Sequence, residues 1–207
     1  MKGLLLKDFY MIGKYCRFFI LMNVIFLVGS IMGEEYMFYA FFPSILLGIL
    51  PMTLIAYDER SKWSVYGNIF PYSRAQMVSV KYVIALIGVG AATLITFIVQ
   101  CLRMCQNSSV TWQEAGIIAM ISGIVGMINP SILLPFIFKY GVEKGRIIYY
   151  IGLGGVSAAS VMFFKGAKLL EVLQDVEGSL FLVLLGVIVL FALSWLLSIR
   201  IYQKKEL

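Results

Sequence analysis

Between Glu114 and Lys139 the chain reads AGIIAMISGIVGMINPSILLPFIF, residues 115–138, which is 24 positions without a charged side chain. A helix of about 20 apolar residues crosses the hydrocarbon core of a bilayer. Further uncharged stretches occupy 18–33, 36–57, 82–102, 147–164 and 179–199. With their flanks, the first and last are predicted to span 16–33 and 179–201. The sequence therefore predicts an all-α polytopic membrane protein, six transmembrane helices in a single domain, 1–207.

Composition agrees with a membrane location. The chain is 61% hydrophobic and has a mean hydropathy of +0.92, far above the balance of a soluble domain. Its net charge of +6 is not the signature of a nucleic-acid-binding protein, because the basic residues are distributed by membrane side. With 207 residues and six spans, no separate soluble domain is expected.

Basic residues gather in alternate connecting segments. Of the 17 Lys and Arg residues, 14 lie in the amino-terminal segment, the second and fourth connections and the carboxyl-terminal tail. The other side has Arg103, Lys165 and Lys168. Positively charged connections stay in the cytoplasm. Both termini, the 58–81 segment and the 139–146 segment are therefore predicted to be cytoplasmic.

The amino terminus has a helical pattern of its own. Leu4, Leu5, Phe9 and Ile12 recur at helical spacing among charged residues. This pattern favours a short amphipathic helix on the inner membrane surface over the alternative, a frayed start of the first span.

The segment 58–81 is the longest cytoplasmic connection. Acidic residues open it, and Trp63, Tyr66 and Phe70 then form one apolar stripe at helical spacing. Pro71 is predicted to end this helix and Ser73 to cap the next one. The stripe has two equally weighted uses: it lies among lipid headgroups, or it fills a groove on a partner protein.

Polar groups within the spans are few and uncharged. Asn129-Pro130 is predicted to bend the fourth span near the membrane midplane, where it shapes a substrate cavity or gate. The alternative is that the Asn129 amide only satisfies the carbonyl of Gly126, which Pro130 leaves without its helical donor. The predicted substrate pathway comprises Asn23, Thr53, Asn129 and Pro130.

The inventory of reactive groups argues against an enzyme. The chain has no histidine and no Gly-x-x-x-x-Gly-Lys-Ser/Thr phosphate-binding sequence. No catalytic residue, metal site or cofactor is expected. The spans carry no carboxylate, which also disfavours transport coupled to protons or sodium.

Two passages carry a resemblance to a known family. They are Lys7-Asp8-Phe9-Tyr10, and the sequence from Tyr57-Asp58-Glu59-Arg60-Ser61-Lys62-Trp63 through Pro71-Tyr72-Ser73-Arg74. The chain resembles, over its whole length, the permease subunits of ABC-2 type bacterial exporters. It is similar to the permeases of phenol-soluble modulin and bacteriocin peptide exporters. Ser64-Val65 and Gly67-Asn68 depart from the family pattern, which bears on the partner contacts.

The resemblance implies a mechanism. Two permease chains, identical or different, would form the export pathway in the bacterial cell membrane, and separate ABC ATPase subunits would bind ATP and Mg²⁺. Segment 58–70 would be a coupling helix that sits in a groove of the ATPase. Segment 139–146 would make a smaller contact with the same subunit. The implied interface residues are Asp58, Glu59, Arg60, Lys62, Trp63, Tyr66, Phe70, Pro71, Ser73, Arg74, Lys139, Glu143 and Lys144.

The apolar spans suit amphipathic or hydrophobic peptides, or lipid-like toxins, as the substrates of export or immunity. The alternative is a membrane pore, or a regulatory membrane subunit not coupled to an ATPase.

Overall fold

The computed structural model describes residues 2–32, 36–63, 72–106, 111–151 and 176–204. Within them the regular structure is helical, which confirms the all-α prediction. The helices are α1 (Lys2–Tyr15), α2 (Arg17–Met32), α3 (Tyr36–Arg60), α5 (Arg74–Gln106), α6 (Trp112–Tyr140) and α9 (Val176–Lys204). Residues 142–151 are also helical.

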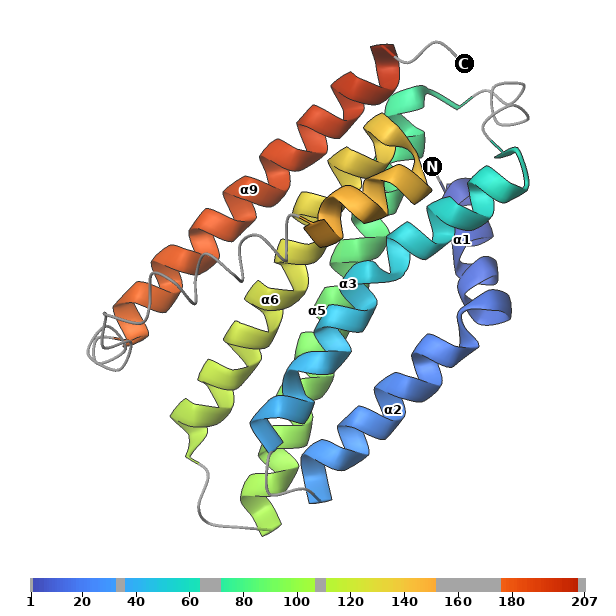
Figure 1. The fold of residues 1–207 in the computed structure, drawn as a ribbon. Coiled ribbons are helices and arrows are strands. Elements are labelled where there is room, and N and C mark those ends of the chain that lie inside the picture. Colours follow the sequence, from blue (N-terminus) through green and yellow to red (C-terminus); the bar gives the residue numbers. More distant parts are fainter. Residues whose placement is uncertain (1, 33–35, 64–71, 107–110, 152–175, 205–207) are drawn as a thin grey trace.

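The long helices lie side by side in a bundle with α3, α5 and α6 at its centre (Figure 1). α2 packs on α3, and α9 packs on α6 and α5. The first and last described residues lie toward the same end of the bundle, where α3 ends and α5 begins (Figure 1). We call this the basal end; it includes Lys2, Arg60, Arg74, Gly141 and Lys204. The distal end is where α5 ends and α6 begins.

The number of membrane spans differs in part from the prediction. Four helical segments are long and apolar enough to cross a membrane: Tyr39–Arg60, Arg74–Cys105, Trp112–Tyr140 and Leu180–Lys204. The pair Lys2–Tyr15 and Arg17–Ile31, bent by 70°, makes a fifth if it is counted as one span. Most of the span predicted at 147–164 lies outside the described residues. The cytoplasmic placement of the basal end stays a prediction.

Helices α3 and α6 approach closely at two glycines. A Cβ added to Gly48 would lie 2.5 Å from the carbonyl oxygen of Gly126 and 3.4 Å from Pro130 Cδ. Pro130 has no N–H to offer the Gly126 carbonyl four residues earlier. That carbonyl is therefore directed against the neighbouring helix, and only a small residue fits opposite it. This contact fixes the centre of the bundle.

A neutral polar group joins three helices in the distal half. The hydroxyls of Ser44 on α3 and Ser122 on α6 are 2.6 Å apart, and Ser122 also reaches the Ala40 carbonyl oxygen at 3.5 Å. The Thr96 hydroxyl on α5 donates to the same carbonyl at 3.4 Å. We call Ala40, Ser44, Thr96 and Ser122 the hydroxyl cluster. Its side-chain hydroxyls are buried.

Helix caps follow the sequence signals. Ser73 accepts from the backbone N–H of Gln76, whose side chain accepts in turn from the Ser73 N–H, both at 3.2 Å. The prediction that Ser73 caps the helix entering the third span is thus confirmed. Thr111 and Glu114 form the same reciprocal cap at the start of α6.

The structure corrects the boundary of the predicted coupling helix. Asp58 and Glu59 lie in the last turn of α3, and Lys62 turns the chain with a φ of 53°. The prediction that a separate helix opens at Asp58 is therefore wrong. A carboxylate is unfavourable near the C-terminus of a helix because of the helix dipole. These two carboxylates have partners elsewhere in the protein, described below, that offset this cost. The rest of the predicted helix, 64–70, lies outside the described residues.

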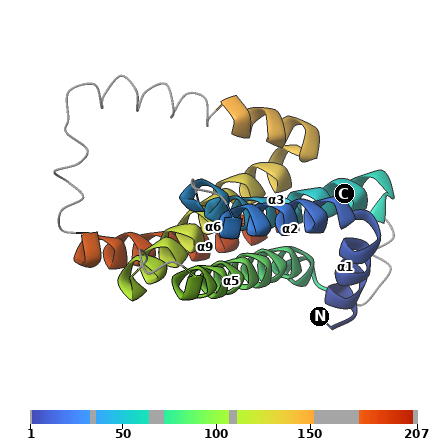
Figure 2. The same cartoon turned by 90° about the horizontal axis from the view of Figure 1, so that it is seen from below.

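The amino-terminal helix is present, and Figure 2 shows α1 set across the end of the bundle. Its predicted apolar stripe mostly faces the protein: Leu4 is buried, and Leu5 and Ile12 pack against a core cluster. Phe9 is exposed, together with Leu6 and Tyr10. This apolar face was predicted to contact lipid, but in the structure most of it packs against the bundle and holds α1 there.

Candidate functional site

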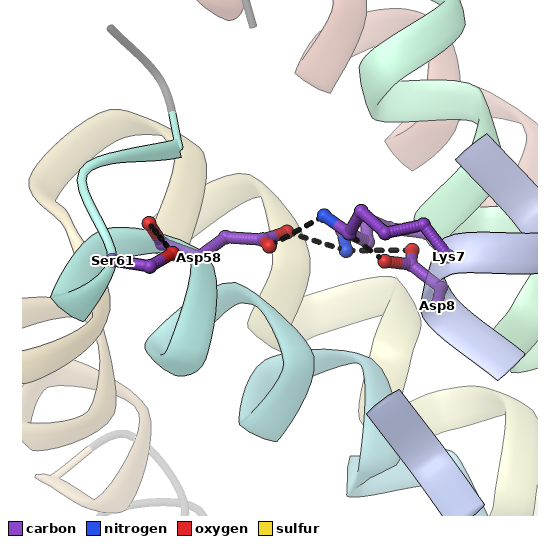
Figure 3. A network of polar contacts seen from close by, with 5 residues as sticks. Lys7, Asp8, Asp58 and Ser61 are labelled. Atoms are coloured by element: carbon purple, nitrogen blue, oxygen red, sulfur yellow. Dashed lines mark hydrogen bonds and ion pairs between the residues drawn. The ribbon is translucent and has the colours of Figure 1, made fainter. Parts of the chain in front are cut away.

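Four charged side chains meet at the basal end. Lys7 and Asp8 come from α1 and Asp58 comes from α3 (Figure 3). Lys81 comes from α5. The Lys7 ammonium lies 2.6 Å from Asp58 Oδ1, and the Lys81 ammonium lies 2.7 Å from both Asp58 Oδ2 and Asp8 Oδ2. Lys7 is also 3.3 Å from Asp8 Oδ1. We call these residues the ion cluster.

The ion cluster is shielded from water. The side chains of Asp8 and Lys81 are 2% and 8% exposed, against 14% for Asp58 and 24% for Lys7. Two cations and two anions cancel, and each carboxylate contacts both ammonium groups, so no buried charge is left without a counter-charge. A small cavity of about 120 Å³ beside the cluster is lined partly by these four residues and by Trp63 and Tyr202. The cluster therefore ties α1, α3 and α5 together at one point.

Trp63 continues this contact beyond α3. The Lys7 ammonium lies 4.3 Å from the centroid of the Trp63 ring, within the range of a cation–π interaction. The half-buried indole packs against a core cluster that includes Leu4 and Val80. The side chain predicted to enter a partner thus also holds the chain after α3 against α1.

Glu59, the neighbour of Asp58, binds a different element. Its carboxylate oxygens accept from the backbone N–H of Val142 at 3.2 and 3.1 Å. Val142 opens helix 142–151, and a carboxylate at a helix N-terminus is favourable. Gly141 makes the turn from α6 with a φ of 83°, which favours glycine. The end of α3 is thus joined to the 139–146 segment.

An open cleft of about 450 Å³ lies between these segments. It is lined by Ala56, Glu59, Arg60, Tyr140, Gly141, Val142, Glu143, Lys144 and Arg146. The structure therefore brings together the two segments from which partner contacts were predicted. We call this the basal cleft.

The other predicted interface residues lie as follows. Arg60, Lys62, Ser73, Lys139, Glu143 and Lys144 are exposed at the basal end. Arg74 is half-buried, and its guanidinium donates to the carbonyl oxygen of Gln203 at 3.1 Å, which links α5 to the end of α9. Tyr66, Phe70 and Pro71 lie outside the described residues. Their predicted contact with an ATPase stays a prediction.

The predicted pathway residues have contacts inside the chain. Asn23 is 8% exposed and donates to the Phe19 carbonyl oxygen of its own helix at 2.7 Å. Asn129 accepts a hydrogen bond from the hydroxyl of Tyr149, which joins α6 to helix 142–151. The Asn129 bond is therefore tertiary, whereas the sequence-based alternative had assigned it to the local carbonyl of Gly126.

Pro130 is buried against Gly48, and Thr53 is half-buried on α3. A role for these four side chains in transport stays a prediction.

Sequence reasoning did not assign the ion cluster. Lys7 and Asp8 were placed on the polar face of an interfacial helix, and Lys81 was placed on the cytoplasmic side at the start of the third span. One signal was present: Lys81 directly precedes the uncharged stretch 82–102, and Asp58 directly follows 36–57. Opposite charges at the same membrane level on successive spans are candidates for an ion pair.

Comparison with known proteins agrees with this architecture. The profile of the ABC-2 family transporter proteins matches residues 3–203, nearly the whole chain. No curated protein and no solved structure matches the chain. With its membrane-length helices and this match, the chain is a multi-pass membrane protein that belongs to the ABC-2 transporter family.

Proposed function

We propose that this chain is the membrane permease subunit of an ATP-driven ABC exporter. A separate ATPase subunit docks at its basal end, on the cytoplasmic side of a bacterial cell membrane, and binds the ATP and Mg²⁺. The permease itself performs no chemistry: it changes conformation when the ATPase pushes on it. Family membership supports this role, because ABC-2 transporters work with an ATPase partner.

The observation that carries the proposal is the bond between Glu59 and the Val142 N–H. It makes one surface from the end of α3 and the start of helix 142–151. A force applied to either segment is passed to the other. The adjacent Asp58 passes the same force to α1 and α5 through the ion cluster. Two neighbouring carboxylates thus connect a docking surface to several helices of the membrane section.

Transport requires a pathway, which this chain forms with a second permease chain. The proposed cargo is an amphipathic or hydrophobic peptide, because the membrane section offers apolar surface and few polar groups. A groove of about 450 Å³ between α5 and α6 supports this choice. Gly90, Leu94, Phe97, Met120 and Gly123 are among its lining residues.

Site-specific photocrosslinking in cells tests the docking. A photoreactive residue replaces exposed Arg60 at the basal end or, as a control, exposed Trp112 at the distal end. We expect the probe at 60 to capture a protein that mass spectrometry identifies by its Gly-x-x-x-x-Gly-Lys-Ser/Thr sequence as an ABC ATPase. The probe at 112 should capture no ATPase. Peptide-stimulated ATP hydrolysis by the purified pair then tests coupling.

A pore or an uncoupled regulatory subunit predicts a different result. Neither position would capture an ATPase, and the purified chain in vesicles would pass or regulate its solute without ATP. That outcome would overturn the exporter proposal.

A further inference from the structure

We propose that the basal cleft receives an acidic segment of the ATPase partner. This inference rests on the proposed function and specifies the chemistry of the docking surface. Asp58 and Glu59 have partners within the chain, and exposed cations outnumber exposed acids at the cleft. The partner's complementary surface is therefore rich in Asp and Glu.

The acidic residues of the basal end have partners inside the protein. Asp8 and Asp58 lie within 3.3 Å of the ammonium groups of Lys7 and Lys81. The Glu59 carboxylate accepts from the Val142 N–H. Among the described residues of this end, the remaining acid is Glu143, which is exposed. Asp8 and Asp58 are thus directed into the protein, whereas Glu59 and Glu143 are exposed, Glu59 with its carboxylate bound to the Val142 N–H.

The cations of the cleft point outward. Arg60 from α3, and Lys144 and Arg146 from helix 142–151, line the cleft and are exposed. Lys62 and Lys139, close to them in sequence, are exposed as well. The cleft also holds two carboxylates, Glu59 and Glu143, so its three cations leave it with a net positive charge. A concave surface with an excess of one sign of charge attracts a segment of opposite charge. An arginine also binds a carboxylate through two parallel hydrogen bonds.

An acidic protein segment fits this cleft better than the anionic headgroups of a membrane. Helices that bind an anionic bilayer combine cations with exposed apolar side chains. The outer face of α1 has that combination: Leu6, Phe9 and Tyr10 are exposed beside Lys2 and Lys14. Among the described residues that line the cleft, Val142 is buried, Ala56 is half-buried, and Tyr140 is the one exposed aromatic side chain. The exposed lining of the cleft is mostly charged, as expected for a polar protein contact.

The test measures the dissociation constant between the purified permease and the purified ATPase that the crosslinking identifies, in an uncharged detergent. The double variant Arg60→Glu/Lys144→Glu reverses one cation on each wall of the cleft. We expect binding about tenfold weaker or more at low salt, because like charges then face each other. The difference should shrink in ~1 M salt, where the Debye length falls to about 3 Å. Glu143→Lys should tighten binding.

The matched control is Lys2→Glu/Lys14→Glu, which makes the same change in net charge at the same end, on α1. We expect it to leave the dissociation constant unchanged. Equal weakening by both double variants would show that only bulk charge matters and would overturn the inference. No weakening by the cleft variant would also overturn it.

The lipid alternative has its own readout. If the cleft variant binds the ATPase normally in detergent but loses affinity for vesicles containing anionic phospholipid, the cleft holds lipid and the inference is wrong. Failure of the unaltered permease to bind the ATPase at any salt concentration is a different result, because it removes the proposed function itself. Circular dichroism and size-exclusion chromatography check that each variant is folded.

Discussion

The ion cluster and the hydroxyl cluster perform the same task with different chemistry. Each joins three helices, α1, α3 and α5 at the basal end and α3, α5 and α6 in the distal half. The first uses four charges, and the second uses neutral hydroxyls and one carbonyl. Charges are costly in hydrocarbon and less so near water. The comparison indicates that the basal end lies at the membrane surface, and that the hydroxyl cluster lies deeper.

Removing one charge from the ion cluster should have the largest effect. Lys81→Met leaves Asp8 and Asp58 without a main counter-charge while keeping most of the length of the side chain. Breaking a buried ion pair costs about 3–5 kcal/mol, and we expect a loss of that order in the free energy of unfolding in detergent. The control is exposed Lys14→Met, which should change stability little. Equal stability of the two variants would show that the cluster contributes nothing.

A methyl group at the helix contact should have the next largest effect. A Cβ on Gly126 would lie 2.8 Å from Val89 Cγ1 and 2.9 Å from Ser44 Cβ. We expect Gly126→Ala to destabilise by about 1–3 kcal/mol, as overpacking does. Gly116→Ala on the same helix meets no atom within 4 Å and should be neutral or stabilising. Thermal unfolding followed by circular dichroism measures both, and equal values would contradict the close approach of α3 and α6.

The Glu59 contact is intermediate in chemistry between the two clusters, because a charged carboxylate binds a neutral backbone N–H. Glu59→Ala removes the acceptor for the Val142 N–H. A lost helix cap costs about 1 kcal/mol, and the start of helix 142–151 should exchange its amide hydrogens faster. Arg60→Ala, at the exposed neighbouring position, should leave that exchange unchanged. Unaltered exchange in both variants would rule out the capping role.

The hydroxyl cluster should respond least. Ser122→Ala removes the 2.6 Å contact with Ser44. Hydrogen bonds between helices in membranes contribute about 0.6 kcal/mol on average, so we expect a loss of that size. The matched change is Ser79→Ala near the basal end, where the Ser79 hydroxyl accepts from the Trp195 ring N–H. Its loss of stability measures the contribution of one neutral hydrogen bond outside the hydroxyl cluster. A loss near that of Lys81→Met would mean that the neutral cluster is as important as the ionic one.

Local signals predicted much of the fold. The uncharged stretches predicted the long helices, and Ser73 after Pro71 predicted the start of α5. The end of α3 was not predicted, because the acidic residues were taken as the first turn of a new helix. Their partners, Lys7, Lys81 and the Val142 N–H, lie far away in sequence. Periodicity within one segment carries no information about such contacts.

The same limit applies to the candidate site. Lys144 was predicted as part of an interface, and the structure places it in one cleft with Arg60. The inward direction of Asp8 was not foreseen, since its position in α1 reads as solvated until the bundle is present. Tyr149 as the partner of Asn129 was missed for the same reason.

The placement of α1 across the end of the bundle has a consequence for biogenesis. Its Lys7 and Asp8 bind residues 51 and 73 positions later in the chain. At a synthesis rate of about 5–20 residues per second, the ribosome needs roughly 4–15 s to make the second of these intervals. During that time α1 has no ionic partner from α5. Its exposed Leu6, Phe9 and Tyr10 suit it to wait on the bilayer surface, so α1 is made before α3 and α5 but is fixed in place only after both.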